Sequence, residues 1–134
     1  MIEPSINFEA RFPVSDWNGN YFQAGCGGFC GLVLPERETH SNSINHALRK
    51  GYAAITTDSG HSGDHIGDAR WALNNPLAEQ VYARDILPIT RAAGHELIKL
   101  IYGKGPDFSY FSGCSNGGRL GAKAAQEYPN LFDG

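Results

Sequence analysis

The feature that most constrains this chain is a glycine-flanked serine, Gly113-Cys114-Ser115-Asn116-Gly117. It lies between a predicted strand at 107–112 and a predicted helix at 119–128, which ends before Pro129. The segment matches G-x-S-x-G, a sharp strand-to-helix turn that presents a serine hydroxyl at the edge of a sheet. It predicts Ser115 as a nucleophile, with Gly113, Gly117 and Gly118 supporting the turn.

A simpler interpretation of the same segment is a glycine-rich loop that binds phosphate or only reverses the chain. A nucleotide-binding P-loop is a poor alternative, because no Gly-Lys-Ser or Gly-Lys-Thr follows. The strand before the serine and the helix after it favour the nucleophile.

The rest of the chain alternates between strand and helix patterns. Residues 6–14 and 21–24 predict two strands, and the Asp16–Gly19 turn between them predicts an antiparallel hairpin. Residues 41–43 can cap a short helix that runs to about residue 50 and stops at Gly51. Residues 52–57 predict a strand buried on both faces.

A long helical pattern follows from about 77 to 101, where Pro88 must kink the helix or begin a second one. Its expected buried stripe is Ile86, Ile89, Ala93, Leu97 and Leu100. Strands separated by helices predict parallel pairing in a sheet of about four strands. The fold class is therefore α/β: a partial α/β-hydrolase core in one incomplete domain, 1–134, with an N-terminal hairpin followed by parallel strands and crossover helices.

An acyl-transfer serine also needs donors for the negative oxygen that forms on the substrate. The amide of Asn116, the residue after the serine, is one candidate. The glycine-rich segment 25–31 is placed to supply the second, and Gly28 is favoured, with Gly27 next. A plain turn at 25–31 is the alternative.

No histidine follows Ser115, although the usual chain order in this fold is serine, acid, histidine. The histidines His61 and His65 come earlier, in a loop after the third strand, and are interpreted as structural or substrate-side residues beside Asp58 and Asp64. We therefore expect the catalytic acid and base to lie outside these 134 residues.

Composition excludes several partners. The net charge is −3 and no basic run exceeds Arg49-Lys50, so no nucleic-acid surface is expected. No apolar stretch is long enough for a membrane span, and no signal-peptide pattern is visible. Three cysteines cannot all pair with one another and lack the spacing of a zinc site, and the pairing of Cys26 with Cys30 is left open.

Three groups of residues together resemble the tannase and feruloyl esterase family. The most specific is Tyr110-Phe111-Ser112-Gly113-Cys114-Ser115-Asn116-Gly117-Gly118-Arg119, followed by 125–129 and 132–134. The others are Asp16–Gly19 leading to Gly27-Gly28-Phe29, and Thr57–Gly63.

The resemblance implies that Cys114 forms a disulfide with a cysteine outside this chain, beside the catalytic histidine. Such a bond indicates an oxidising compartment, so the intact protein is expected to be secreted or periplasmic. The resemblance also implies a lid outside the chain, with a structural calcium site there and no cofactor in this chain.

The predicted function is a serine carboxylic ester hydrolase for small aromatic or phenolic esters, such as gallates or ferulates. By itself, the 134-residue chain is expected to be inactive. The alternatives are a peptidase or lipase with the same nucleophile, a non-catalytic or degenerate module, and a cysteine nucleophile at Cys114.

Overall fold

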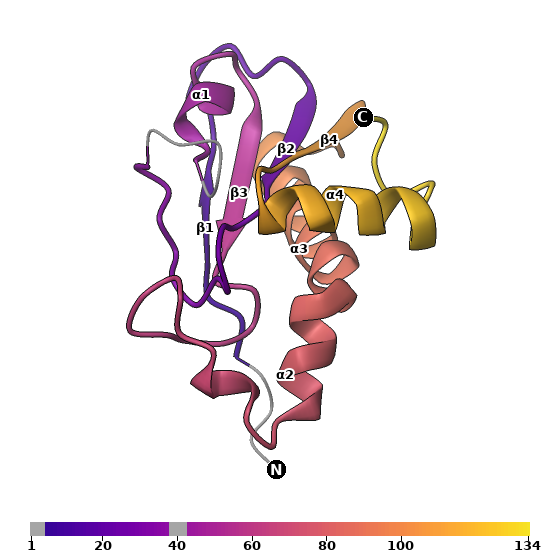
Figure 1. Cartoon of the computed structure of the whole chain (residues 1–134). Helices are drawn as coiled ribbons and strands as arrows, with labels where there is room; N and C mark the ends of the chain where they lie inside the picture. The colour runs from indigo at the N-terminus through magenta and orange to yellow at the C-terminus, as the bar shows by residue number, and fades with distance from the viewer. Residues whose placement is uncertain (1–4, 38–42) are drawn as a thin grey trace.

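The computed structural model of the chain describes residues 5–37 and 43–134 (Figure 1). A four-stranded sheet forms its centre, and the helices pack on the two faces of that sheet. In chain order the elements are β1 Phe8–Arg11, β2 Asn20–Ala24, α1 Asn45–Leu48, β3 Ala53–Thr57, the 3₁₀ turn η1 Arg70–Ala72, α2 Pro76–Gln80, the π-helical turn η2 Val81–Asp85, α3 Ile86–Tyr102, β4 Phe108–Ser112 and α4 Asn116–Glu127.

The order of the strands across the sheet is β1-β3-β2-β4, with β2 parallel to both β3 and β4. This confirms the predicted α/β class and its parallel strands. The predicted hairpin is wrong, because β1 runs antiparallel to β3 and not beside β2. Charged residues Glu9 and Arg11 suit β1 to an edge, whereas the fully buried β3 takes an inner position.

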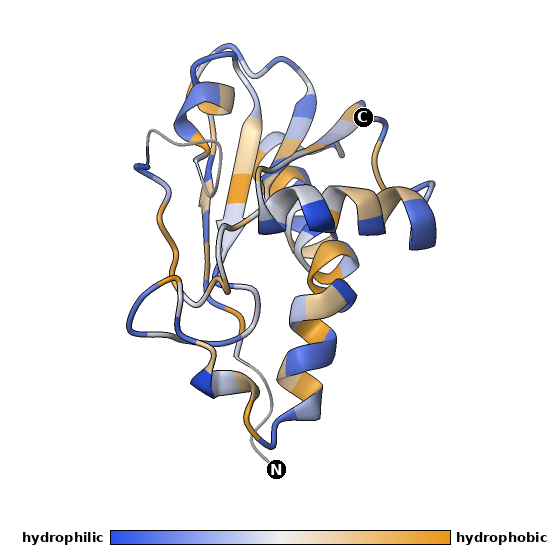
Figure 2. Cartoon of the chain, in the orientation of Figure 1, coloured by the Kyte–Doolittle hydropathy of each residue, from blue (hydrophilic) through white to orange (hydrophobic). Residues whose placement is uncertain are grey.

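Successive residues of β2 and β3 point to opposite faces of the sheet, as the two-residue strand period requires. Tyr21 and Ile55 pack on one face with Ile98 of α3. Phe22 and Ala54 pack on the other face with Ala47 of α1. Figure 2 shows apolar colour along much of β3, which is buried at all five positions.

The buried face of α3 differs from the predicted stripe. Ile86 is buried as expected, but Ile89 and Leu100 are 44% and 80% exposed. The helix instead faces the sheet through a set that is not uniformly apolar: Leu87, Thr90, Gly94 and Ile98. A Cβ on Gly94 would collide with the ring of Tyr21, so close packing requires a small residue there. A pattern of hydrophobic residues does not identify such a position as buried.

The predicted irregularity near Pro88 takes the form of the π-helical turn η2, which joins α2 to α3. In an i→i+5 pattern the partner of the Ala83 carbonyl would be the N–H of Pro88, which does not exist. Arg119 of α4 supplies the missing donor, because its Nη1 lies 2.9 Å from the Ala83 oxygen.

The short helix α1 begins at Asn45, with Ile44 at the cap position and no side-chain cap. The predicted capping residue Ser43 therefore lies one residue before the cap position, and residues 41 and 42 lie outside the described residues. Gly51 follows the helix with a left-handed φ of 84°, and this agrees with its predicted role as the stop signal.

Parallel pairing brings three chain segments to one edge of the sheet. Ala24 is in register with Thr56 of β3 and Ser112 of β4. The segments that follow these strands, 25–31, 58–68 and 113–117, therefore leave the sheet at the same end.

Candidate active site

Ser115 stands at the corner between β4 and α4. It occupies the cap position of α4 with φ 57° and ψ −118°, and its side chain makes no capping hydrogen bond. This left-handed φ is uncommon for a residue with a side chain. The residue is exposed, so the corner presents its hydroxyl to solvent at the edge of the sheet.

Close backbone contacts explain two of the three expected glycines around this corner. A Cβ on Gly113 would lie 2.6 Å from the Cα of Gly117, and one on Gly117 would lie 3.2 Å from the backbone of Gly25. A Cβ on Gly118 would meet its nearest atom, the oxygen of Gly113, at an ordinary 3.7 Å. Packing therefore requires glycine at 113, favours it at 117 and does not require it at 118.

The glycine-rich segment 25–31 lies directly beside the corner. Gly25 N–H donates to the Ser112 carbonyl at 2.8 Å. The Asn116 side-chain nitrogen donates to the Cys26 carbonyl at 3.3 Å and lies 3.2 Å from Cys30 Sγ. The structure thus brings the predicted nucleophile segment and the predicted donor segment together.

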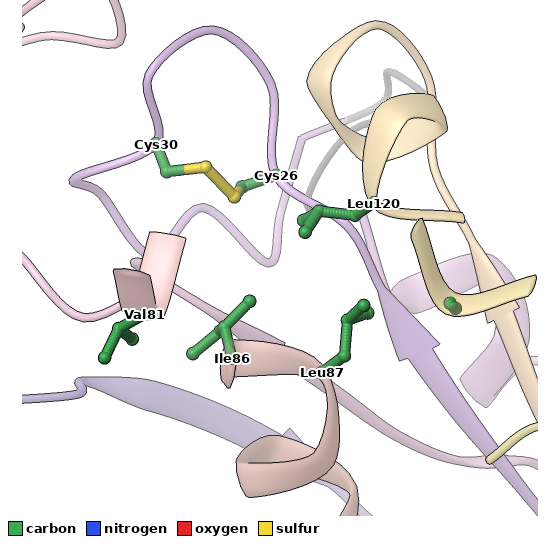
Figure 3. Close-up of a cluster of buried hydrophobic side chains, with 7 residues drawn as sticks. Cys26, Cys30, Val81, Ile86, Leu87 and Leu120 are labelled. Atoms are coloured by element: carbon green, nitrogen blue, oxygen red, sulfur yellow. A yellow bond between two sulfur atoms is a disulfide. The ribbon is translucent and has the colours of Figure 1, made fainter. Parts of the chain in front are cut away.

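A disulfide between Cys26 and Cys30 answers the pairing question that the sequence leaves open. The bond closes a small ring around Gly27, Gly28 and Phe29 and packs against Leu120 of α4 and the η2–α3 junction (Figure 3). Cys114 lies exposed next to Ser115.

The backbone around Gly28 is fixed on both sides. Gly28 has φ 60°, and a Cβ there would collide with the carbonyl of Ile66. The next amide, Phe29 N–H, donates to that carbonyl at 2.7 Å. Gly28 is exposed and Gly27 is buried, so Gly28 is the more accessible of the two candidate donors.

His61 fastens the loop after β3 to this segment. Its Nε2 lies 2.6 Å from the Phe29 carbonyl, and its ring stacks on Trp71 with 3.7 Å between centroids. Burial lowers the pKa of His61, so the ring is neutral near pH 7 and Nε2 is the donor. Its Nδ1 is buried, and its Nε2 is occupied by the Phe29 carbonyl.

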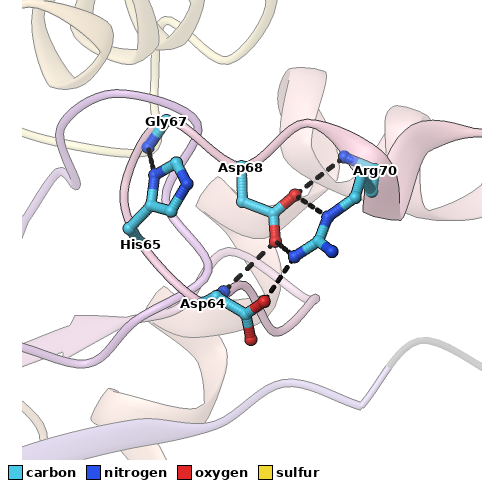
Figure 4. A network of polar contacts seen from close by, with 5 residues as sticks. All are labelled: Asp64, His65, Gly67, Asp68 and Arg70. Atoms are coloured by element: carbon cyan, nitrogen blue, oxygen red, sulfur yellow. Dashed lines mark hydrogen bonds and ion pairs between the residues drawn. The ribbon is translucent and has the colours of Figure 1, made fainter.

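His65 lies farther along the same loop, where its Nδ1 accepts from Gly67 N–H at 3.1 Å. The loop is held by Arg70, which binds both Asp64 and Asp68 (Figure 4). The Arg70 hydrogen bonds hold the pKa of Asp68 well below its usual range. The sequence predicted Asp58 and Asp64 as hydrogen-bond partners of these two histidines. In the structure Asp58 accepts hydrogen bonds from Asn7 and from Gly60 N–H, and Asp64 binds Arg70.

Sequence reasoning missed Tyr82 and the roles of the Asn116 side chain and of Arg119. Arg119 Nε donates to the Asn116 side-chain oxygen at 2.8 Å, and its guanidinium lies 4.7 Å from the centre of the Tyr82 ring. The one sequence feature that could have indicated the role of Arg119 is Pro88. It has no N–H to donate, so a carbonyl in the preceding helical turn needs a donor from elsewhere in the fold.

No helix within the ranges 5–37 and 43–134 is long and apolar enough to cross a bilayer. Over that same part of the chain, no group of three or more His, Cys, Asp or Glu side chains is arranged to hold a metal ion.

The parallel strands β2, β3 and β4, the left-handed serine corner at their carboxyl edge and the adjoining glycine loop define a partial α/β-hydrolase fold. Residues 2–134 match the family model described as "Tannase and feruloyl esterase". The chain belongs to that family.

Individual relatives agree with this assignment. The chain is 39% identical to an uncharacterised esterase of Xanthomonas campestris, over 98% of this chain and 22% of the relative. It is 37% identical to a probable feruloyl esterase B-1 of Aspergillus terreus, over 96% of this chain and 22% of the relative. The crystal structure of feruloyl esterase B from Aspergillus oryzae superimposes with a TM-score of 0.83 at 32% identity, covering 96% of this chain and 24% of that one. The chain thus spans about a fifth of the length of these curated relatives.

Proposed function

We propose that these residues are the nucleophile-bearing part of a serine carboxylic ester hydrolase. The observation that carries the proposal is the exposed Ser115 at a left-handed corner, directly beside a loop whose tip carries the exposed Gly28. Strained residues of this kind persist only where the surrounding structure holds them in place, and they cluster at active sites.

In the proposed reaction, Ser115 Oγ attacks the ester carbonyl carbon and its proton passes to a histidine outside these residues. The oxygen of the tetrahedral intermediate accepts hydrogen bonds from the amides of Asn116 and Gly28, with Gly27 as the second choice. Asn116 is the first residue of α4, where backbone N–H groups lack partners within the helix. Collapse breaks the ester C–O bond, the alcohol leaves with the proton, and water then hydrolyses the acyl-serine.

For the substrate we propose esters of aromatic acids such as ferulate or gallate. The support is family membership, together with relatives whose names specify feruloyl esterase activity. The Cys26–Cys30 disulfide supports an oxidising compartment, secreted or periplasmic. Pairing of Cys114 with a cysteine near the histidine, and structural calcium in a lid, are proposals about residues outside this chain.

The test uses the intact protein and a chromogenic aromatic ester. Ser115→Ala is expected to lower kcat by about 10⁴-fold or more, because a serine triad without its nucleophile retains little activity. Ser112→Ala is the matched control, since Ser112 is also exposed, lies three residues earlier and uses its backbone carbonyl toward Gly25. Retained turnover in Ser115→Ala would contradict the proposal.

Further measurements separate the alternatives. Hydrolysis of amides in preference to esters would indicate a peptidase, and loss of activity only in Cys114→Ala would indicate a cysteine nucleophile. A fluorophosphonate that labels the intact protein at Ser115 would exclude a degenerate module. The chain of 134 residues alone is expected to turn over little or no p-nitrophenyl ester.

A further inference from the structure

The two proposed oxyanion donors come from segments far apart in the sequence, at Gly28 and Asn116. Donors must lie about 2.7–3.1 Å from the developing oxyanion to act on it, so the spacing between the two segments matters. The disulfide restrains the loop internally but does not bond it to α4. Packing of Gly117 on Gly25, packing of Leu120 on the disulfide and hydrogen bonds between the segments together set that spacing.

The Tyr82 hydroxyl lies between these two segments. Its oxygen is 2.9 Å from the Asn116 side-chain oxygen and 3.3 Å from the Gly28 carbonyl oxygen. Both neighbours are acceptors, so the hydroxyl proton is shared between them or donated to the nearer one. Tyr82 comes from the π-helical turn η2, a third part of the chain.

The Asn116 side chain faces inward and is 9% exposed. Its oxygen accepts from Tyr82 and Arg119, while its nitrogen faces the Cys26 carbonyl and Cys30 Sγ. These partners fix which end of the amide is oxygen and leave none of it for a substrate. The side chain therefore links α4 to the segment 25–31 through hydrogen bonds.

The peptide group that follows the proposed Gly28 donor is held at both ends. Its carbonyl faces Tyr82, and its N–H, from Phe29, donates to Ile66. Glycine has wide rotational freedom, so anchoring the next peptide limits how far the Gly28 amide can turn. Loss of the Tyr82 contact would release the carbonyl end.

The Tyr82 ring is itself fixed in place. The Arg119 guanidinium covers one side at 4.7 Å, and the His61 and Trp71 rings lie 5.8 and 5.0 Å away between centroids. A phenylalanine at this position would keep these ring contacts and lose only the hydroxyl. The substitution therefore isolates the hydroxyl from the packing.

We propose that Tyr82 is a positioning residue whose hydroxyl, acting through the Asn116 side chain and the Gly28 carbonyl, sets the spacing of the two oxyanion donors. This inference rests on the proposed function and identifies a residue that acts without touching the substrate.

The test is Tyr82→Phe in the intact protein. We expect kcat to fall by about 10-fold, the loss that corresponds to one neutral hydrogen bond, with KM within about twofold of the parent value. Affinity for an arylboronic acid, which forms a tetrahedral adduct with a serine nucleophile, should fall by the same factor as kcat. A residue with a purely structural role would lower the unfolding midpoint without this selective loss of tetrahedral-adduct binding.

Tyr102→Phe is the matched control, because the Tyr102 hydroxyl also binds a backbone carbonyl, that of Pro13, at 2.7 Å. It should leave kcat and boronate affinity unchanged. Asn116→Ala and the double variant complete a cycle: if Tyr82 acts through Asn116, adding Tyr82→Phe to Asn116→Ala should lower kcat by much less than 10-fold.

The outcomes separate the two proposals. If Ser115→Ala is inactive but Tyr82→Phe keeps parental kcat and boronate affinity, the role of Tyr82 is refuted and the proposed function stands. A change in KM alone, or equal losses in Tyr82→Phe and Tyr102→Phe, also refutes it. If Ser115→Ala keeps its activity, both proposals fail.

Discussion

Replacing Ser115 with glycine should stabilise the protein while it removes the proposed nucleophile. The backbone at this position has φ 57° and ψ −118°, a conformation that a Cβ disfavours. Glycine lacks the Cβ, so Ser115→Gly relieves the strain. Ser115→Ala keeps it, and because the serine side chain makes no capping bond, alanine loses no helix cap.

The size of the effect follows from two opposing terms. A non-glycine residue in such a region costs about 1–3 kcal/mol, which glycine recovers. Glycine also gives the unfolded chain more freedom, which costs about 0.5–1 kcal/mol relative to alanine. The glycine variant should therefore be more stable than the alanine variant by about 1 kcal/mol, near the middle of the range that the two terms span.

The assay is urea unfolding of the two variants in the intact protein, both of which lack the hydroxyl. Ser112 in β4 supplies a control of opposite sign, because glycine in a strand should be less stable than alanine there. If Ser115→Gly is no more stable than Ser115→Ala, the argument from a strained corner is wrong.

Two further predictions concern other parts of the fold. Burial lowers the pKa of His95 from 6.5 to about 4. The unfolded state therefore takes up a proton first as the pH falls, so the protein should lose stability through His95 as the pH falls from 6.5 to 4. Unfolding of His95→Gln across this range should show a flatter pH dependence than the parent, and an equal slope would contradict the shift. Gly113→Ala would place a Cβ 2.6 Å from the Gly117 backbone. It should cost about 1–3 kcal/mol and lower kcat. Gly118→Ala lies in a helix, where the new Cβ would make only an ordinary 3.7 Å contact, so it should be neutral or stabilising. Equal unfolding midpoints for the two variants would count against the packing argument.

The serine corner illustrates what local sequence is able to predict. Its conformation depends on a strand, a few glycines and a helix that are consecutive in the chain, so the pattern is sufficient to place Ser115. The end of the short helix at Gly51 likewise depends only on residues that are close together in the chain. The same holds for β3, whose apolar, uncharged residues indicate burial on both faces.

The partner of β1 could not be predicted in this way. The turn at residues 16–19 is compatible with a hairpin, and only the competition among strands for the inner positions places β3 between β1 and β2. The face of α3 is a second example, because Gly94 packs on Tyr21 through its small size and not its hydrophobicity.

The sequence by itself therefore determined the α/β class, the serine corner and the glycine-rich segment at 25–31, since each depends on residues that are neighbours along the chain. Only the tertiary structure decided the strand order, the Cys26–Cys30 pairing and the contact of Tyr82 with both Asn116 and Gly28. Those features join segments that are distant in sequence, and their geometry depends on how helices and strands pack, which no local pattern encodes.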